Sequence, residues 1–249
     1  MTRTDGRSGN QKNVESRKRQ ELIFNISSRH ITDIERQLLQ RSTILPKLKN
    51  LKFLRLRVKT FWNAVIMENF VRSLGALEFL EEVELPPGSG VACVVDTLLQ
   101  QLQHLKYLQI LALNENMNDR SLLQVAKASK DGKLSRIRSL HLICNTEVTD
   151  AGWHDFFQHL DNMYHLRELN ISLLYMHPMK PHPSTIKALA QCILRLPHLL
   201  IVFMFAWLVD VADQKLLNDV KANHPQSKCI NIFWQQPLPC LPVIEKENF

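Results

Sequence analysis

The chain has 249 residues, of which 45% are hydrophobic and only seven are glycine, and its formal net charge at pH 7 is +7. This length and apolar content suffice for one or two folded domains with a substantial core. The scarcity of glycine argues against the closely spaced glycine loops that cradle phosphates, so we expect no nucleotide site and no cofactor.

Much of the positive charge lies at the N-terminus, in the segment 1–20. This segment holds six basic and two acidic side chains, which give it +4 and leave +3 for the rest of the chain. Because it has no apolar cluster to offset the loss of conformational entropy, we predict a disordered basic leader over residues 1–20. The run Arg17-Lys18-Arg19 resembles a weak nuclear-import or phosphate-binding patch, but a solvated tail is the simpler interpretation, and no nucleic acid partner is expected.

A leucine pattern recurs along the chain at nearly constant steps. The spacing L-x-x-L-x-x-L-x-L occurs as LKNLKFLRL, LEFLEEVEL and LKYLQILAL, and then in three degenerate copies, LSRIRSLHL, MYHLRELNI and LPHLLIVFM. The third apolar position of each copy falls at Leu54, Val83, Leu111, Leu140, Leu169 and Val202, so the positions advance by nearly equal intervals until a longer final one. A period of about 28 or 29 is the signature of leucine-rich repeats, with one supersecondary unit per repeat.

Two imperfect copies flank this array. By the same count, Phe24 in LIFNI and Ile230 in CINIF are the positions equivalent to Leu54 and Val202. We therefore predict an N-terminal capping repeat over 21–47, leucine-rich repeats over 48–234 and a C-terminal tail over 235–249.

The segments between the strand patterns have helical spacing. In one of them the apolar residues are Trp153, Phe156, Phe157 and Leu160, and Thr149 stands where a helix would begin. Ser184, directly after Pro183, marks another predicted helix start. The proline-rich run 177–183 predicts a loop that leaves the regular surface, because neither a helix nor a central strand tolerates it.

The fold class predicted from these units is α/β, a leucine-rich-repeat solenoid shaped like the ribonuclease-inhibitor horseshoe. Parallel strands line its concave face and helices its convex face. Asn116 and Asn145 each follow the last leucine of their strand pattern by three positions. In repeats of this type, an asparagine at that position bonds the turning backbone with its side chain.

Several segments resemble the C-terminal repeat region of the NLR family apoptosis inhibitory proteins. The residues that carry the resemblance are LEEVELPPGSG (80–90), TDAGWHDFFQHLDNMYHLRELNIS (149–172), QCILRLPHL (191–199) and AWLVDVADQKLLNDVKANHPQSK (206–228). The likeness covers about residues 40 to 242. It implies the repeat module that in this family folds back over a nucleotide-binding module and helps to sense bacterial proteins.

The chain departs from that family in what accompanies the repeats. It has no G-x-x-x-x-G-K-S/T loop and no Cys/His grouping with zinc spacing, whereas family members carry a nucleotide-binding NACHT module and zinc-binding baculoviral inhibitor repeats. The resemblance therefore does not carry caspase inhibition, nucleotide exchange or nucleotide-driven assembly over to this chain, and we interpret the chain as a fragment, a short isoform or a truncated paralogue.

The residues between the inward leucines are expected to face the concave surface. The candidate protein-binding residues are Arg55, Arg57, Glu82, Glu84, His141, Glu168, Asn170, Ile201, Phe203 and Phe205. Arg55 is expected beside Glu84, a structural pairing that stabilises by only about 0.2–1 kcal/mol. The three apolar residues of the sixth strand indicate a partner site, unless the Pro181 loop or the tail after Trp234 covers them.

No catalytic or metal-binding arrangement is visible. The five cysteines are odd in number and widely spaced, which favours free thiols, and the ten histidines form no zinc pattern and are expected to be exposed and unliganded. No apolar run is long enough to cross a membrane and no secretory signal is present, so a cytoplasmic location is expected.

Three classes of function remain open at this point. The first is a cytosolic interaction module of innate immunity, with protein partners such as an NLR nucleotide-binding module, inflammasome components or bacterial proteins. The second is the substrate-recognition adaptor of a ubiquitin ligase, although residues 1–47 have no room for the helices of an F-box. A pull-down that lacks the ligase scaffold would exclude this second function. The third is an enzyme, for which we expect no turnover in an activity screen.

Overall fold

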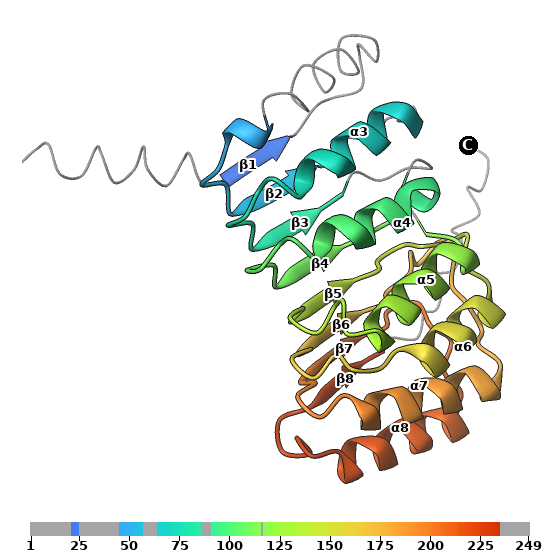
Figure 1. The fold of residues 1–249 in the computed structure, drawn as a ribbon. Coiled ribbons are helices and arrows are strands. Elements are labelled where there is room, and N and C mark those ends of the chain that lie inside the picture. Colours follow the sequence, from blue (N-terminus) through green and yellow to red (C-terminus); the bar gives the residue numbers. More distant parts are fainter. Residues whose placement is uncertain (1–20, 25–44, 57–63, 86–90, 116, 235–249) are drawn as a thin grey trace, which may run out of the picture.

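A computed structural model describes residues 21–24, 45–56, 64–85, 91–115 and 117–234 of the chain. Strands and helices alternate along most of it (Figure 1). The strands are β1 Glu21–Phe24, β2 Phe53–Leu56, β3 Glu82–Glu84, β4 Ile110–Ala112, β5 Ser139–His141, β6 Glu168–Asn170, β7 Ile201–Phe203 and β8 Asn231–Phe233. The helices are the short 3-10 helix η1 Leu45–Lys47 and the α-helices α3 Ala64–Leu74, α4 Val91–Leu102, α5 Asp119–Lys130, α6 Asp150–His159, α7 Pro183–Arg195 and α8 Val211–Asn223.

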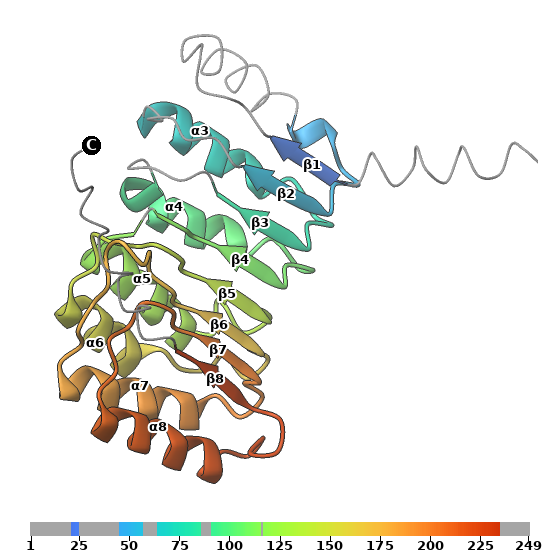
Figure 2. The same cartoon turned by 180° about the vertical axis from the view of Figure 1, so that it is seen from behind.

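The strands form one parallel sheet in chain order from β1 to β8. The predicted equivalent positions pair with one another in each successive register, from Leu54 and Val83 through to Leu169 and Val202. Parallel strands need a crossover segment, and the helices supply it on one side of the sheet (Figure 2). The predicted leucine-rich-repeat solenoid, with strands on the inner face and helices on the outer face, is confirmed.

The register at the two ends differs from the prediction by two positions. Leu22, not Phe24, pairs with Leu54, and Ile232, not Ile230, pairs with Val202. Side chains two apart on a strand share a face, so the apolar pattern of an imperfect copy does not distinguish the two registers. The leader and the tail, together with most of the N-terminal unit, lie outside the described residues.

The core lies between the sheet and the helices. The leucine and valine positions of the repeat are almost fully buried, as Leu54, Leu111 and Leu140 show with exposures of 0%. Burying each such side chain stabilises the fold by about 1.5–3 kcal/mol. Because each unit has an apolar face that it cannot cover alone, this burial depends on the neighbouring repeat.

The helices α5, α6, α7 and α8 begin at polar caps. Thr149 caps α6 as predicted, since its Oγ1 accepts a hydrogen bond from the Gly152 N–H at 3.1 Å. The prediction for α7 was wrong in detail: the cap is His182, whose Nδ1 accepts from the Ser184 N–H at 3.3 Å, and the helix begins at Pro183. Proline at the first helical position is favourable because its missing N–H has no partner there.

Aspartates in the first turn of two helices bind the start of the following helix. Asp119 in α5 accepts hydrogen bonds from the N–H and hydroxyl of Thr149, both at 2.7 Å. Asp150 in α6 accepts from the N–H of His182 at 3.0 Å and the hydroxyl of Thr185 at 3.0 Å. The Asp119 carboxylate occupies the space where a side chain on Gly152 would stand.

Asn145 has the role predicted for it. Its Oδ1 accepts from the Met117 N–H at 2.8 Å, and its Nδ2 donates to the Leu113 carbonyl at 3.0 Å. Both bonds are buried and join neighbouring repeats, so this one amide satisfies two backbone groups of a turn. Asn116 lies outside the described residues.

The proline-rich run forms a loop between β6 and α7, as predicted, but this loop stays on the array. Met179 and Trp207 form a parallel bridge, the Leu208 N–H donates to the Met179 carbonyl at 2.8 Å, and Pro181 is buried. The loop therefore packs against the corresponding loop of the next repeat.

Four aromatic rings fill the core beneath this loop. The Trp207 ring centroid lies 5.6 Å from that of Trp153 and 6.0 Å from that of Phe157. Phe156 packs against these two α6 rings, at 5.8 and 5.6 Å. The Trp207 Nε1–H donates to the Ile171 carbonyl at 2.9 Å, whereas the buried Trp153 Nε1 has no hydrogen-bond partner. Trp153 meets its neighbours Phe156 and Trp207 edge to face, an arrangement that aromatic pairs favour.

Candidate protein-binding surface

The first strands of the concave face carry ion pairs that neutralise one another. Arg55 donates to both carboxylate oxygens of Glu82, from Nε at 2.6 Å and from Nη2 at 2.8 Å, and Lys52 lies 2.7 Å from Glu81. The register places Arg55 opposite Glu84 as predicted, but the bidentate partner is Glu82, two positions earlier on the same strand. A side chain as long as arginine reaches the diagonal neighbour, which the register alone does not reveal. Arg57 lies outside the described residues.

The middle of the concave face is polar and half-buried. His141 Nε2 and Glu168 Oε1 lie 3.1 Å apart on adjacent strands, so the structure brings two of the predicted residues together. Asn170 is engaged within its own turn, where its Oδ1 accepts from the Ser172 N–H at 3.1 Å. These groups have protein partners, so an incoming ligand gains little new hydrogen bonding from them.

The C-terminal end of the concave face is apolar. Phe203 lies between two other rings, with its centroid 5.7 Å from that of Phe205 and 5.4 Å from that of Phe233, to which it is stacked at 18°. Ile201 precedes Phe203 on the same face of β7. We call these four side chains the apolar cluster: Ile201, Phe203, Phe205 and Phe233. The first three are half-buried and Phe233 is 42% exposed.

Phe233 was not among the residues predicted from the sequence, although a signal for it exists. Phe233 is the register partner of Phe203, as the residue that follows the repeat position in β8. Counting the last repeat from Ile230 instead of Ile232 concealed that equivalence. Once the register is known, the row of aromatic residues continues across the last two strands.

Two segments were considered as covers for the apolar cluster, the Pro181 loop and the tail after Trp234. The contacts of the Pro181 loop do not support the first. The loop that contains Pro181 pairs through Met179 with the segment after β7, at the carboxyl edge of the sheet. The second alternative concerns the tail after Trp234, which lies outside the described residues. Among the residues that the structure describes, Phe233 is the most exposed member of the apolar cluster, and it lies on the last strand.

Buried ionisable side chains in the outer layer serve the fold. Burial raises the pKa of the Cys192 thiol to about 12, which keeps it protonated. His224 was expected to be exposed, but it is 2% exposed: its Nε2 lies 3.1 Å from the Leu196 carbonyl and its Nδ1 accepts from the Gln226 N–H at 3.0 Å. Burial, and then the negative charge of Asp210, raise the pKa of Asp213 in the first turn of α8.

The described part of the chain contains no group of histidine, cysteine and acidic side chains that could hold a metal ion. Cys93, Cys144, Cys192 and Cys229 are free thiols there, while Cys240 lies in the undescribed tail. Of the helices that the structure describes, none has the length and apolar content that crossing a bilayer requires.

Comparison with solved structures finds a similar fold at low sequence identity. A protein from Bacteroides fragilis aligns with a TM-score of 0.50 at 11% identity, over 88% of this chain and 67% of that one. An internalin from Listeria monocytogenes gives a TM-score of 0.38 at 14% identity, over 78% of this chain and 52% of that one. No family model matches the chain. The strand register and the helical outer layer define the class: a leucine-rich-repeat solenoid, a fold whose curved inner surface suits protein binding.

Comparison with curated proteins identifies relatives. Human baculoviral IAP repeat-containing protein 1 is 40% identical over 202 residues, which is 81% of this chain and 14% of the relative. Mouse baculoviral IAP repeat-containing proteins 1e and 1b are each 38% identical, over 81% and 82% of this chain and 14% of their own length. These matches confirm the predicted resemblance: the chain is related to the C-terminal region of the NLR family apoptosis inhibitory proteins and spans about one seventh of those relatives.

Proposed function

We propose that this chain is a non-catalytic, cytoplasmic protein-interaction module that acts like the ligand-sensing and autoinhibitory end of an inflammasome receptor. In this proposal its partner is the nucleotide-binding module of such a receptor, bound in trans. The observation that carries the proposal is the apolar cluster at the C-terminal end of the concave face, in a chain related to receptors of this kind.

The concave surface divides into two parts with different capacities for binding. Arg55 and Glu82 already satisfy each other, and so do His141 and Glu168, so their contribution to a new interface is small. Phe203 and Phe233 present stacked aromatic faces that are not fully covered. Large aromatic side chains at the centre of an interface carry most of its binding energy. The apolar cluster is therefore the expected centre of binding, with the charged strands at its rim.

The test is a binding measurement with the purified full chain and the nucleotide-binding module of the human relative. Phe203→Ser and Phe233→Ser are expected to weaken binding at least about tenfold, because each removes an aromatic anchor. The matched control is Val211→Ser, since Val211 is 82% exposed at the start of α8 on the helical layer. This control is expected to bind like the wild type.

The Phe233→Ser variant is expected to stay folded, because Phe233 lies on the last strand and is 42% exposed. A thermal melt of each variant accompanies the binding measurement. Absence of binding by the wild-type chain would contradict the proposal. So would equal binding by the folded Phe233→Ser variant and the control.

A further inference from the structure

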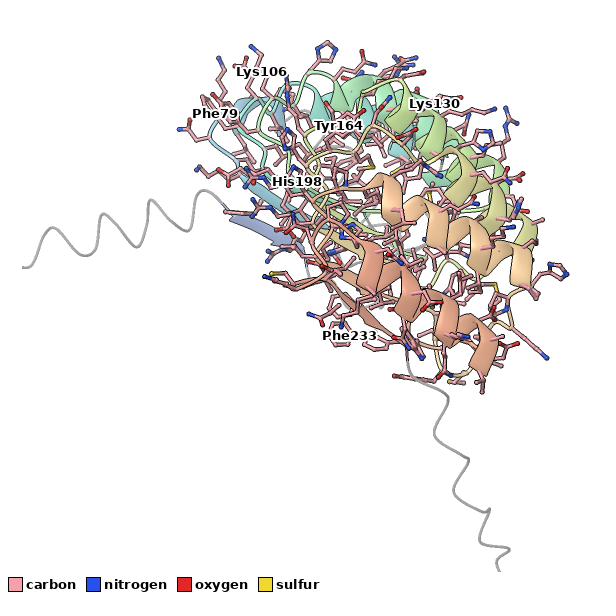
Figure 3. All side chains as sticks on the ribbon, turned by 90° about the horizontal axis from the view of Figure 1, so that it is seen from below. Phe79, Lys106, Lys130, Tyr164, His198 and Phe233 are labelled. Atoms are coloured by element: carbon pink, nitrogen blue, oxygen red, sulfur yellow. The ribbon has the colours of Figure 1, made fainter. Side chains whose placement is uncertain are left out.

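A row of basic side chains lies on the turns that lead from the helices into the strands. In the four turns 105–109, 134–138, 163–167 and 196–200, no acidic residue occurs. These turns carry six exposed basic or imidazole side chains, which we call the basic edge: Lys106, Arg136, Arg138, His165, Arg167 and His198. Figure 3 shows Lys106, Tyr164 and His198 on the same side of the molecule.

The backbone holds these side chains at fixed intervals. The Arg138 N–H donates to the Gln109 carbonyl at 2.7 Å, the Arg167 N–H donates to the Arg138 carbonyl at 2.7 Å, and the Leu200 N–H donates to the Arg167 carbonyl at 2.8 Å. The hydrogen-bond ladder of the parallel sheet therefore continues through these turns, and we call each turn one rung of it. Neighbouring rungs of a sheet are about 4.8 Å apart. Arg138 and Arg167 hold equivalent positions on adjacent rungs, and so do Arg136, His165 and His198 on three successive rungs.

The cations of the basic edge have no carboxylate partner within the described residues. Lys106, Arg136, Arg138 and Arg167 make no ion pair, whereas Arg55 is held by a carboxylate. Asp131 lines a neighbouring hollow together with Arg136, but it makes no ion pair with it. Like charges held one rung apart repel each other, and an anionic partner relieves that repulsion.

Two shallow hollows open between these side chains. One, of about 250 Å³, is lined by residues that include Lys106, Arg136 and Arg138, and the other, of about 90 Å³, is lined by Arg138, His165, Arg167 and His198. Arg138 and His165 border both hollows. The two hollows therefore lie next to each other along the edge, across successive rungs.

We propose that the basic edge binds an acidic α-helix of a partner protein. Carboxylates at positions i, i+4 and i+7 of a helix recur about every 5.4 Å, once per turn, which is close to the rung spacing of about 4.8 Å. A single-stranded nucleic acid instead calls for a basic groove with open aromatic platforms. Here the basic groups lie along an outer edge, and the two aromatic side chains of these turns, Tyr107 and Tyr164, are each 53% exposed but belong to turns that are not adjacent. This inference is independent of the apolar cluster.

The test uses a labelled synthetic peptide of roughly 20 residues, long enough to form a helix, with glutamates at helical spacing on one face. Its binding to the full chain is measured by fluorescence anisotropy at low and high salt. The double variant Arg138→Glu/Arg167→Glu is expected to weaken binding at least about tenfold, and added salt is expected to weaken binding to the wild type.

The matched control is Lys187→Glu/Lys215→Glu, which makes the same change of charge on the outer helices α7 and α8. Lys187 and Lys215 are exposed and lie on adjacent repeats, like the two arginines. The control is expected to lose less than about twofold in affinity, because these lysines are not on the basic edge. A peptide with the same glutamates in scrambled order is expected to bind more weakly than the helical one.

Three outcomes would overturn the proposal: no binding of the helical peptide, equal losses in the edge and control variants, or tighter binding of an oligothymidylate that the edge variant abolishes. The last would assign the surface to nucleic acid instead. Circular dichroism checks that both variants are folded. Phe203→Ser, which changes the apolar cluster and not the basic edge, is expected to leave binding of the acidic peptide unchanged. A failure of the peptide to bind the basic edge can therefore be distinguished from a failure of the proposed function.

Discussion

Replacing Asn145 with alanine is expected to destabilise the chain by about 2–6 kcal/mol, because two buried backbone groups lose their partner. Asn145 is 1% exposed, and its amide pairs with the Met117 N–H at 2.8 Å and the Leu113 carbonyl at 3.0 Å. Each buried group left without a partner costs about 1–3 kcal/mol. Since a domain is stable by only about 5–15 kcal/mol, this loss is a large share of the total.

Chemical denaturation of the wild type and the variant measures this loss, and amide hydrogen exchange locates it. Exchange at Met117 is expected to accelerate most, because that N–H loses its acceptor. Asn223→Ala is the control, since Asn223 makes one exposed hydrogen bond, to the Asp219 carbonyl at 2.8 Å, and its loss should cost within about 0.5 kcal/mol. The reasoning fails if the two variants lose similar stability, or if exchange at Met117 does not change.

Three further predictions concern single residues. Gly152→Ala is expected to destabilise by about 1–3 kcal/mol, because the new methyl group displaces the Asp119 carboxylate from its hydrogen bonds; a denaturation midpoint equal to that of the wild type would contradict this. In the folded chain Cys192, with its pKa raised to about 12, is expected to resist alkylation that modifies the exposed Cys93 readily, as peptide mass spectrometry can show. The raised pKa of Asp213 means that the folded state binds its proton more tightly than the unfolded state, so this residue's contribution to stability falls as pH rises above about 3.8. Asp213→Asn should therefore gain stability over the wild type at neutral pH and lose that gain in acid below the unfolded-state pKa, as urea titrations under the two conditions would test.

The repeat positions could be predicted because burial imposes them. A residue such as Leu111 must be apolar in each unit, because it faces the core and stacks on its counterparts Val83 and Leu140. Apolar residues therefore recur in the sequence at the period of the repeat. The Thr149 cap and the bonding of the turning backbone by Asn145 could be predicted too, from the residue type at a fixed place in the repeat. These positions have one physical role each, and few residue types can fill it.

The details that could not be predicted depend on side-chain reach and on irregular ends. The register shows that Arg55 faces Glu84, but the rotamer that takes its guanidinium to Glu82 is not encoded in any spacing. The end register stayed ambiguous because Ile230 and Ile232 lie on the same face of a strand. His224 looked like a surface residue until the fold placed the Leu196 carbonyl beside it.

The basic edge was overlooked for a different reason. The excess charge was assigned to the segment 1–20, and the remaining +3 gave no sign of clustering. Arg138 and Arg167 belong to successive repeats and are far apart in the sequence, so their proximity follows only from the strand pairing. Counting charge by repeat position, instead of by segment, would have found the row.

Within the described residues, each strand pairs with the strands of the neighbouring repeats and each α-helix packs on the helices before and after it in the chain. The array can therefore bend through small movements between neighbouring repeats. A small rotation at one junction is passed along and added to the next, so slight changes at many junctions alter the curvature of the whole. A partner that grips the two ends can tighten or open the arc without breaking any single layer of the core.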